Sequence, residues 1–173
     1  MTSSLMIFLI LSVANLKPDK NIESNVYDTI VVSFSQRKLV VYDSSYLKIA
    51  SYPVAIPKKS VKVTLPVYGH VIGTQLNPNW YPTQKLIDYY KKKGVVLPRV
   101  IKAGDPLNAM GEGKIIIKFT SGHITPLSRI HGTYQEWLIG KRVSSGCIRM
   151  KNSDIKSLIK IIKNKKTSVI YKQ

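Results

Sequence analysis

Apolar and polar residues alternate through most of the first half of the chain, which is the pattern of half-buried β-strands. The β-branched and aromatic residues that strands favour gather in four segments: 26–34, 38–42, 47–56 and 61–73. Pro66 and Gly69 are expected to break the last segment. Two later segments, 114–119 and 168–171, show the same composition. The pattern therefore predicts a mainly β protein.

Two segments have helical periodicity instead. Residues 83–93 place apolar side chains on one face and meet Gly94, a residue type that ends helices. A second helix is expected from residue 152, with Asn152 or Ser153 as its N-terminal cap. Its apolar residues recur at every third or fourth position: Ile155, Leu158, Ile159 and Ile162. No internal repeat and no second domain are visible in the sequence.

The N-terminus has a different character from the rest of the chain. Residues 1–14 carry no charged side chain, and their apolar run is too short to cross a bilayer. We expect this segment to be a secretory signal peptide or an N-terminal anchor, followed by a polar linker, 15–25, and one domain, 26–173. Export would place the protein in the periplasm or cell envelope. No stable membrane span is expected beyond that anchor.

Charge narrows the classes of partner. With 27 Lys and Arg against 9 Asp and Glu, the formal net charge is +18. Such a chain is attracted to polyanions, which include nucleic acid, anionic lipid and anionic wall polymers. No nucleic-acid-binding motif is recognisable, so nucleic acid is not an expected partner. The three His and one Cys lack the spacing of metal ligands, so no metal and no cofactor are expected.

The candidate chemistry lies in residues 131–150. Cys147 is the only cysteine and cannot form an intramolecular disulfide. His131 is a candidate base for its thiol, and Arg149 adds positive charge that favours a thiolate. Backbone N–H groups in the turn before Cys147 can face an oxyanion formed when sulfur attacks a carbonyl. From the residue types alone, a buried and inert cysteine remains the alternative.

This segment reads HGTYQEWLIGKRVSSGCIRM and resembles the motif of the L,D-transpeptidases, the family of the YkuD catalytic domain. That family has a His-Gly-Thr element and then a Ser-x-Gly-Cys-Ile-Arg element. Three upstream stretches resemble the branch that includes ErfK, YbiS, YcfS and YnhG: YPVAIPKKSVKVTLPVYG (52–69), NPNWYPT (77–83) and LPRVIKAGDPLNAMG (97–111). The resemblance covers residues 28–172. It implies a β-sandwich or barrel of mixed sheets with two short helices.

The resemblance also implies roles for individual residues. Cys147 would be the nucleophile, His131 would move its proton, and the backbone carbonyl of Gly132 would orient His131. The N–H of Gly146 would bind the oxyanion. Substrate contacts are implied for four further residues: Ser144, Ser145, Arg149 and Trp80.

The implied reaction is acyl transfer on peptidoglycan tetrapeptide stems, with release of D-Ala and an amine of another stem or of an envelope lipoprotein as acceptor. With water as acceptor, the enzyme would be an L,D-carboxypeptidase. The family most often has His where Ser145 stands, which keeps open a wall-binding protein whose site has decayed. An NlpC-type peptidase is disfavoured because His131 precedes Cys147 in the chain, the reverse of the order in that family.

Overall fold

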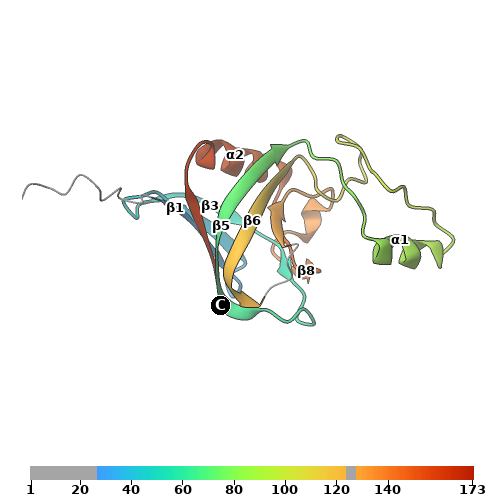
Figure 1. Cartoon of the computed structure of the whole chain (residues 1–173), viewed down its shortest axis with the longest axis horizontal. Coiled ribbons are helices and arrows are strands. Elements are labelled where there is room, and N and C mark those ends of the chain that lie inside the picture. Colours follow the sequence, from blue (N-terminus) through green and yellow to red (C-terminus); the bar gives the residue numbers. More distant parts are fainter. Residues whose placement is uncertain (1–26, 124–127) are drawn as a thin grey trace, which may run out of the picture.

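A computed structural model describes residues 27–123 and 128–173 of the chain. More of the described residues belong to strands than to helices, and Figure 1 shows a strongly curled sheet with helix α2 packed against it and helix α1 set apart. The strands are β1 (Asp28–Ser33), β2 (Lys38–Tyr42), β3 (Lys48–Pro53), β4 (Ile56–Pro57), β5 (Thr64–Leu76), β6 (Gly113–His123), β7 (Arg129–His131), β8 (Arg142–Ser144), β9 (Ile148–Arg149) and β10 (Thr167–Lys172). The helices are α1 (Gln84–Lys91), α2 (Asn152–Ile162) and a 3-10 turn, Glu136–Leu138.

Eight strands form one mixed sheet in the order β3-β2-β1-β10-β5-β6-β7-β9, and β4 pairs with β8. The pairs β1–β10 and β7–β9 are parallel, whereas β5–β6 and β6–β7 are antiparallel. The prediction of a mainly β fold with mixed sheets and two short helices is therefore confirmed. The parallel pair β7–β9 brings two short segments, 129–131 and 148–149, side by side at the end of the sheet.

The core lies between the curled sheet and α2. The predicted apolar face of α2 is buried there: Ile155, Leu158, Ile159 and Ile162. Strand residues from both halves of the sheet complete the core, among them Ile30, Val41, Ile115, Ile130, Ile148 and Tyr171. Because this packing anchors β7 and β9 through Ile130 and Ile148, the residues beside them in the chain are held in fixed positions.

The predicted break at Pro66 and Gly69 is wrong, because β5 runs through both residues. Shifts in the pairing with β6, between Thr64 and Tyr68 and again between Tyr68 and Gly69, absorb the irregularity. A side chain at position 69 would place its Cβ 2.7 Å from the Lys118 carbonyl oxygen of β6. Glycine at this position therefore permits a close approach of the two strands rather than ending one of them.

The predicted cap of α2 is also wrong. The N-cap is Lys151, and neither Asn152 nor Ser153 caps the helix with its side chain. The Glu136 carboxylate instead accepts the Asn152 N–H at 2.6 Å, which satisfies one of the open donors at the helix start. The Asn152 side chain is thereby left available for the contacts described below.

The predicted signal peptide or anchor, 1–14, and the linker, 15–25, lie outside the described residues. Within the described ranges, no helix is long and apolar enough to span a membrane.

Candidate functional site

The sheet register brings the candidate base together with three cationic side chains. His131 of β7 pairs with Lys114 of β6 on one side and with Arg149 of β9 on the other. Paired residues of neighbouring strands project to the same face, as do alternate residues of one strand. Arg129, two residues before His131, therefore shares that face with Lys114, His131 and Arg149. Cys147 directly precedes β9, two residues before the partner of His131.

His131 is almost fully buried, and its Nδ1 lies 2.5 Å from the carbonyl oxygen of Gly132. Because a carbonyl oxygen only accepts, Nδ1 carries the proton in this contact. Burial lowers the pKa of His131 to about 4, against the hydrogen bond to Gly132, which raises it. The charges of Arg149, Arg129 and Lys114 lower it further. At neutral pH the imidazole is therefore uncharged, and its Nε2 carries the lone pair that a base requires.

Cys147 is half-buried. Burial raises the pKa of its thiol, while a backbone hydrogen bond from Arg129 and the charges of Arg129 and Arg149 lower it. The balance keeps the thiol protonated at rest. A nucleophile of this kind loses its proton to a neighbouring base at the moment of attack.

The turn that carries Cys147 is fixed by two serines. The hydroxyl of Ser144 donates to the Cys147 carbonyl oxygen at 2.5 Å and accepts the Gly146 N–H at 3.3 Å. The hydroxyl of Ser128 donates to the Gly146 carbonyl oxygen at 2.9 Å. Ser144 is 1% exposed, and its hydroxyl is committed to this turn. Ser145, in contrast, is exposed.

The raised pKa of Cys147 makes a direct prediction. The rate of alkylation by iodoacetamide should rise with pH through a midpoint above the pKa of an unperturbed cysteine, which is about 8.5. Replacing Arg129 by Met should move the midpoint higher, because it removes a positive charge that favours the thiolate. Mass spectrometry of the single thiol measures both rates. A midpoint below 8 would contradict the effect of burial.

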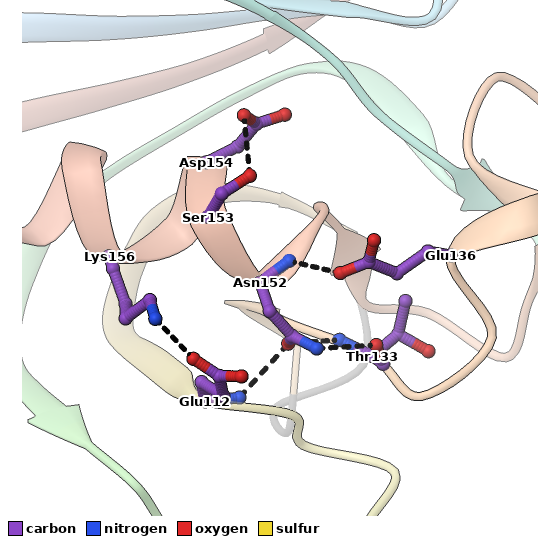
Figure 2. A network of polar contacts seen from close by, with 7 residues as sticks. All are labelled: Glu112, Thr133, Glu136, Asn152, Ser153, Asp154 and Lys156. Carbon is purple, nitrogen blue, oxygen red and sulfur yellow. Dashed lines mark hydrogen bonds and ion pairs between the residues drawn. The ribbon is translucent and has the colours of Figure 1, made fainter.

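A side chain of α2 clamps the segment that follows His131 (Figure 2). Asn152 Oδ1 accepts the N–H groups of Glu112 at 3.0 Å and Thr133 at 3.2 Å, and Nδ2 donates to the Thr133 carbonyl oxygen at 3.1 Å. A Cβ at position 132 would lie 2.3 Å from Asn152 Oδ1, so Gly132 is required for this approach. The ion pair between Lys156 and Glu112 also joins α2 to the residue that precedes β6. Asn152 thus fixes Thr133, the residue directly after the Gly132 carbonyl, and ties it to Glu112.

Replacing Asn152 by Ala should lower the free energy of unfolding by about 2–3 kcal/mol, because two backbone N–H groups and one carbonyl lose their partner. For a domain of this size that corresponds to a fall in Tm of roughly 4–12 °C, which calorimetry measures. Ser153→Ala is the matched control, since Ser153 is exposed and its hydroxyl donates to the neighbouring Asp154. Equal effects of the two variants would contradict the clamp.

Residues 27–170 match the family model of YkuD, the L,D-transpeptidase catalytic domain. The chain belongs to the L,D-transpeptidase family. Among curated relatives, the probable L,D-transpeptidase YcfS of Escherichia coli strain K12 is 33% identical over 75% of this chain and 39% of its own length. The probable L,D-transpeptidase ErfK/SrfK of Salmonella typhimurium is 35% identical over 77% of this chain and 40% of its own length. The chain thus spans about two fifths of the length of these relatives.

Solved L,D-transpeptidases share the fold. L,D-transpeptidase 3 of Mycobacterium tuberculosis, in complex with a faropenem-derived adduct, superposes with a TM-score of 0.55 at 13% identity, covering 84% of this chain and 60% of the other. The Ldtfm-avibactam carbamoyl enzyme gives 0.56 at 17% identity, covering 86% and 49%. At these identities the likeness establishes the L,D-transpeptidase catalytic-domain fold.

The structure places most of the expected L,D-transpeptidase site residues in one region, and Trp80 outside it. Trp80 pairs with Ile101 at the base of a separate loop, and among the described residues no hydrogen bond joins it to β7 or β9. Arg149 donates from Nη1 to Gln135 Oε1 at 3.3 Å, while its buried Nε has no hydrogen-bond partner in the described part of the chain.

Sequence reasoning missed four residues of this region: Lys114, Ser128, Arg129 and Asn152. None of the four belongs to the motif of residues 131–150. Their contributions depend on strand register and on the helix start. For Arg129, its position two residues before His131 was the available signal, because alternate residues of one strand share a face.

Proposed function

We propose that this chain is a cysteine-dependent L,D-transpeptidase that acts on the tetrapeptide stems of peptidoglycan in the periplasm or cell envelope. The observation that carries the proposal is the placement of His131 against the Gly132 carbonyl and beside the turn of Cys147. Its Nδ1–H is committed to the Gly132 carbonyl oxygen, and its lowered pKa leaves Nε2 unprotonated and free to accept a proton, on the strand that pairs with β9 directly after Cys147. The curated relatives named as probable L,D-transpeptidases support the same reaction class.

In the proposed first step, Cys147 Sγ attacks the carbonyl carbon of the third stem residue while His131 Nε2 takes the thiol proton. The C–N bond to the terminal D-Ala then breaks, and the imidazolium gives its proton to the departing amine. A thioester remains on Cys147. The Gly132 carbonyl stabilises the orientation of His131 in both proton transfers, a role that a carboxylate plays in serine-protease triads.

The oxyanion of the tetrahedral intermediate needs donors close to Cys147. The Gly146 N–H is the proposed donor. Its present contact with Ser144 Oγ is long, at 3.3 Å. An oxyanion is a stronger acceptor than a hydroxyl because it is charged. Ser144 and Ser128 are positioning residues in this scheme, because both hold the turn and neither is exposed.

The cationic face around the thiol supports a substrate that carries carboxylates. The guanidinium of Arg149 has an unpartnered Nε, and Lys114 and Arg129 place two further positive charges on the same side of the sheet. The terminal carboxylate of D-Ala and the side-chain carboxylate of the third stem residue suit such a site. We assign substrate binding to Arg149 and to the exposed Ser145. Trp80 would contact the substrate from the separate loop whose base it closes.

In the second step, an amine acceptor attacks the thioester, loses its proton to His131 and releases Cys147 as a thiol. The acceptor is an amine of another stem or a lysine of an envelope lipoprotein. Water in its place would make the chain an L,D-carboxypeptidase. A decayed, wall-binding protein is the second candidate, because Ser145 stands where the family most often has His.

The experiment is incubation of the purified protein with disaccharide-tetrapeptide, followed by mass spectrometry of the products, with the Cys147→Ala variant as the blank. Cysteine-dependent loss of D-Ala with a cross-linked dimer would support transpeptidation. Tripeptide alone would identify a carboxypeptidase. If folded wild-type protein leaves the tetrapeptide intact, the decayed-site candidate replaces the proposal.

A further inference from the structure

A segment of twenty residues, 81–100, projects from the sheet between β5 and β6, and we call it the arm. Figure 1 shows its helix, α1, standing apart from the sheet and from α2. Trp80 and Ile101 close the base of the arm, since each backbone N–H donates to the carbonyl oxygen of the other at 2.8 Å. Asn108 ties the base further by donating to the carbonyl oxygens of Pro78 and Lys102. The arm therefore has a fixed root and a free end.

Most side chains of the arm are exposed and do not pack on the rest of the molecule. Helix α1 buries none of its eight residues. Helices of this length are unstable alone in water, so contacts outside the helix must contribute to its stability. Large apolar side chains are instead exposed along the arm, and Val96 is the most open at 88%: Tyr81, Tyr89, Val95, Val96 and Val100. Exposed apolar side chains that gather in one segment are typical of an interaction surface.

The arm is also strongly basic. It carries five cationic residues against a single acidic one, Asp88: Lys85, Lys91, Lys92, Lys93 and Arg99. Asp88 accepts a hydrogen bond from Gln84, and the ammonium group of Lys93 lies 4.7 Å from the centre of the Tyr89 ring. A short amphipathic helix with aromatic and aliphatic residues beside a run of lysines has the composition of segments that lie in the surface of an anionic bilayer.

We propose that the arm docks on an anionic phospholipid surface. The ammonium groups of Lys91, Lys92 and Lys93 bind lipid phosphates, and Val95 and Val96 enter the boundary between headgroups and acyl chains. A hydrophilic wall polymer would match the lysines but would leave the exposed valines in water. A second copy of this chain, with its net charge of +18, would bring two basic arms together against their repulsion. The proposal does not depend on the proposed activity.

The single cysteine allows a test on the full chain. In a Cys147→Ser background, Val96→Cys is labelled with a polarity-sensitive fluorophore and mixed with phosphatidylcholine vesicles, with or without phosphatidylglycerol. We expect a blue shift of the emission with the anionic vesicles alone. A label at Tyr46→Cys, an equally exposed position in the turn between β2 and β3, is the matched control and should not shift. The comparison of the two labels reports contact at the arm even where another segment also binds the vesicle.

Charge reversal gives the second measurement. Changing Lys91, Lys92 and Lys93 together to Glu should weaken the vesicle-dependent shift by about 10²-fold or more in apparent affinity. The same change at Lys58, Lys59 and Lys62 alters the net charge equally and should weaken it far less.

Four results would overturn the proposal. Equal shifts at both label positions, or equal losses from the two triple variants, would mean attraction by net charge alone. A shift at Val96→Cys with muropeptides or sacculi and none with vesicles would identify a wall or substrate contact. A shift that follows protein concentration without lipid would identify self-association.

Discussion

Replacing Cys147 by Ser should lower the rate of D-Ala release by at least about 10³-fold while the protein remains folded. A hydroxyl is far less acidic than a thiol, and a serine nucleophile depends on a histidine that a carboxylate supports. Here the partner of His131 Nδ1 is the neutral carbonyl of Gly132, and burial already disfavours the imidazolium. The substituted oxygen would therefore keep its proton. Product analysis by mass spectrometry gives the rate.

Two further readouts separate lost chemistry from lost structure. Wild-type protein should accumulate a mass equal to the stem without D-Ala, and Cys147→Ser should not. The melting temperature should change by no more than about 2 °C, because oxygen also accepts the backbone hydrogen bond from Arg129. Ser153→Ala, on the exposed side of α2, should keep full activity. If the serine variant retained a tenth of the wild-type rate, Cys147 would not be the nucleophile.

The sequence alone predicts the elements in which one buried face follows the local spacing of apolar residues. The apolar spacing of Ile155, Leu158, Ile159 and Ile162 predicts the face of α2 that the structure buries. Alternation predicts β1 and β2, whose inward residues reach the core. In both cases burial of one face decides the conformation, and the sequence records that face directly.

Elements that depend on distant partners could not be found in this way. Strands β7 and β9 have three and two residues, too few for a detectable period. They exist because β7 pairs with β6 on one side and with β9 on the other. The continuity of β5 through Pro66 depends on register shifts against β6, which leave no local trace.

The candidate site shows the same division. His131 and Cys147 stand out from the sequence because their residue types carry chemistry and because the surrounding motif resembles a family. Asn152 was expected to cap a helix, which is the common local use of an asparagine there. It instead holds Thr133 and Glu112, because the Glu136 carboxylate serves the helix start. A competition between two capping groups is a tertiary effect and is invisible in a single sequence.

Replacing His131 by Gln should lower kcat/KM by about 10²–10⁴-fold, because the thiol then has no base and the departing amine no acid. The size of the effect rests on the protonation state of His131, which NMR of the imidazole Cε1–H measures directly. One of the three histidines should titrate with a midpoint near 4, and that resonance should be missing in His131→Gln. His70→Gln, at a half-buried position on β5, is the matched control and should leave the rate and this midpoint unchanged.

The same pKa links His131 to stability. Between pH 6.5 and about 4 the unfolded chain binds a proton at this residue and the folded chain does not, so the free energy of unfolding must fall as the pH falls through this window. His131→Gln should remove that part of the pH dependence, whereas His70→Gln should retain it. The contrary result is a His131 midpoint near 6.5, with equal pH dependence in the wild type and both variants. It would mean that His131 is solvated in the folded chain. It would then enter the reaction partly protonated, and the neutral base on which the proposed proton transfer rests would be lost.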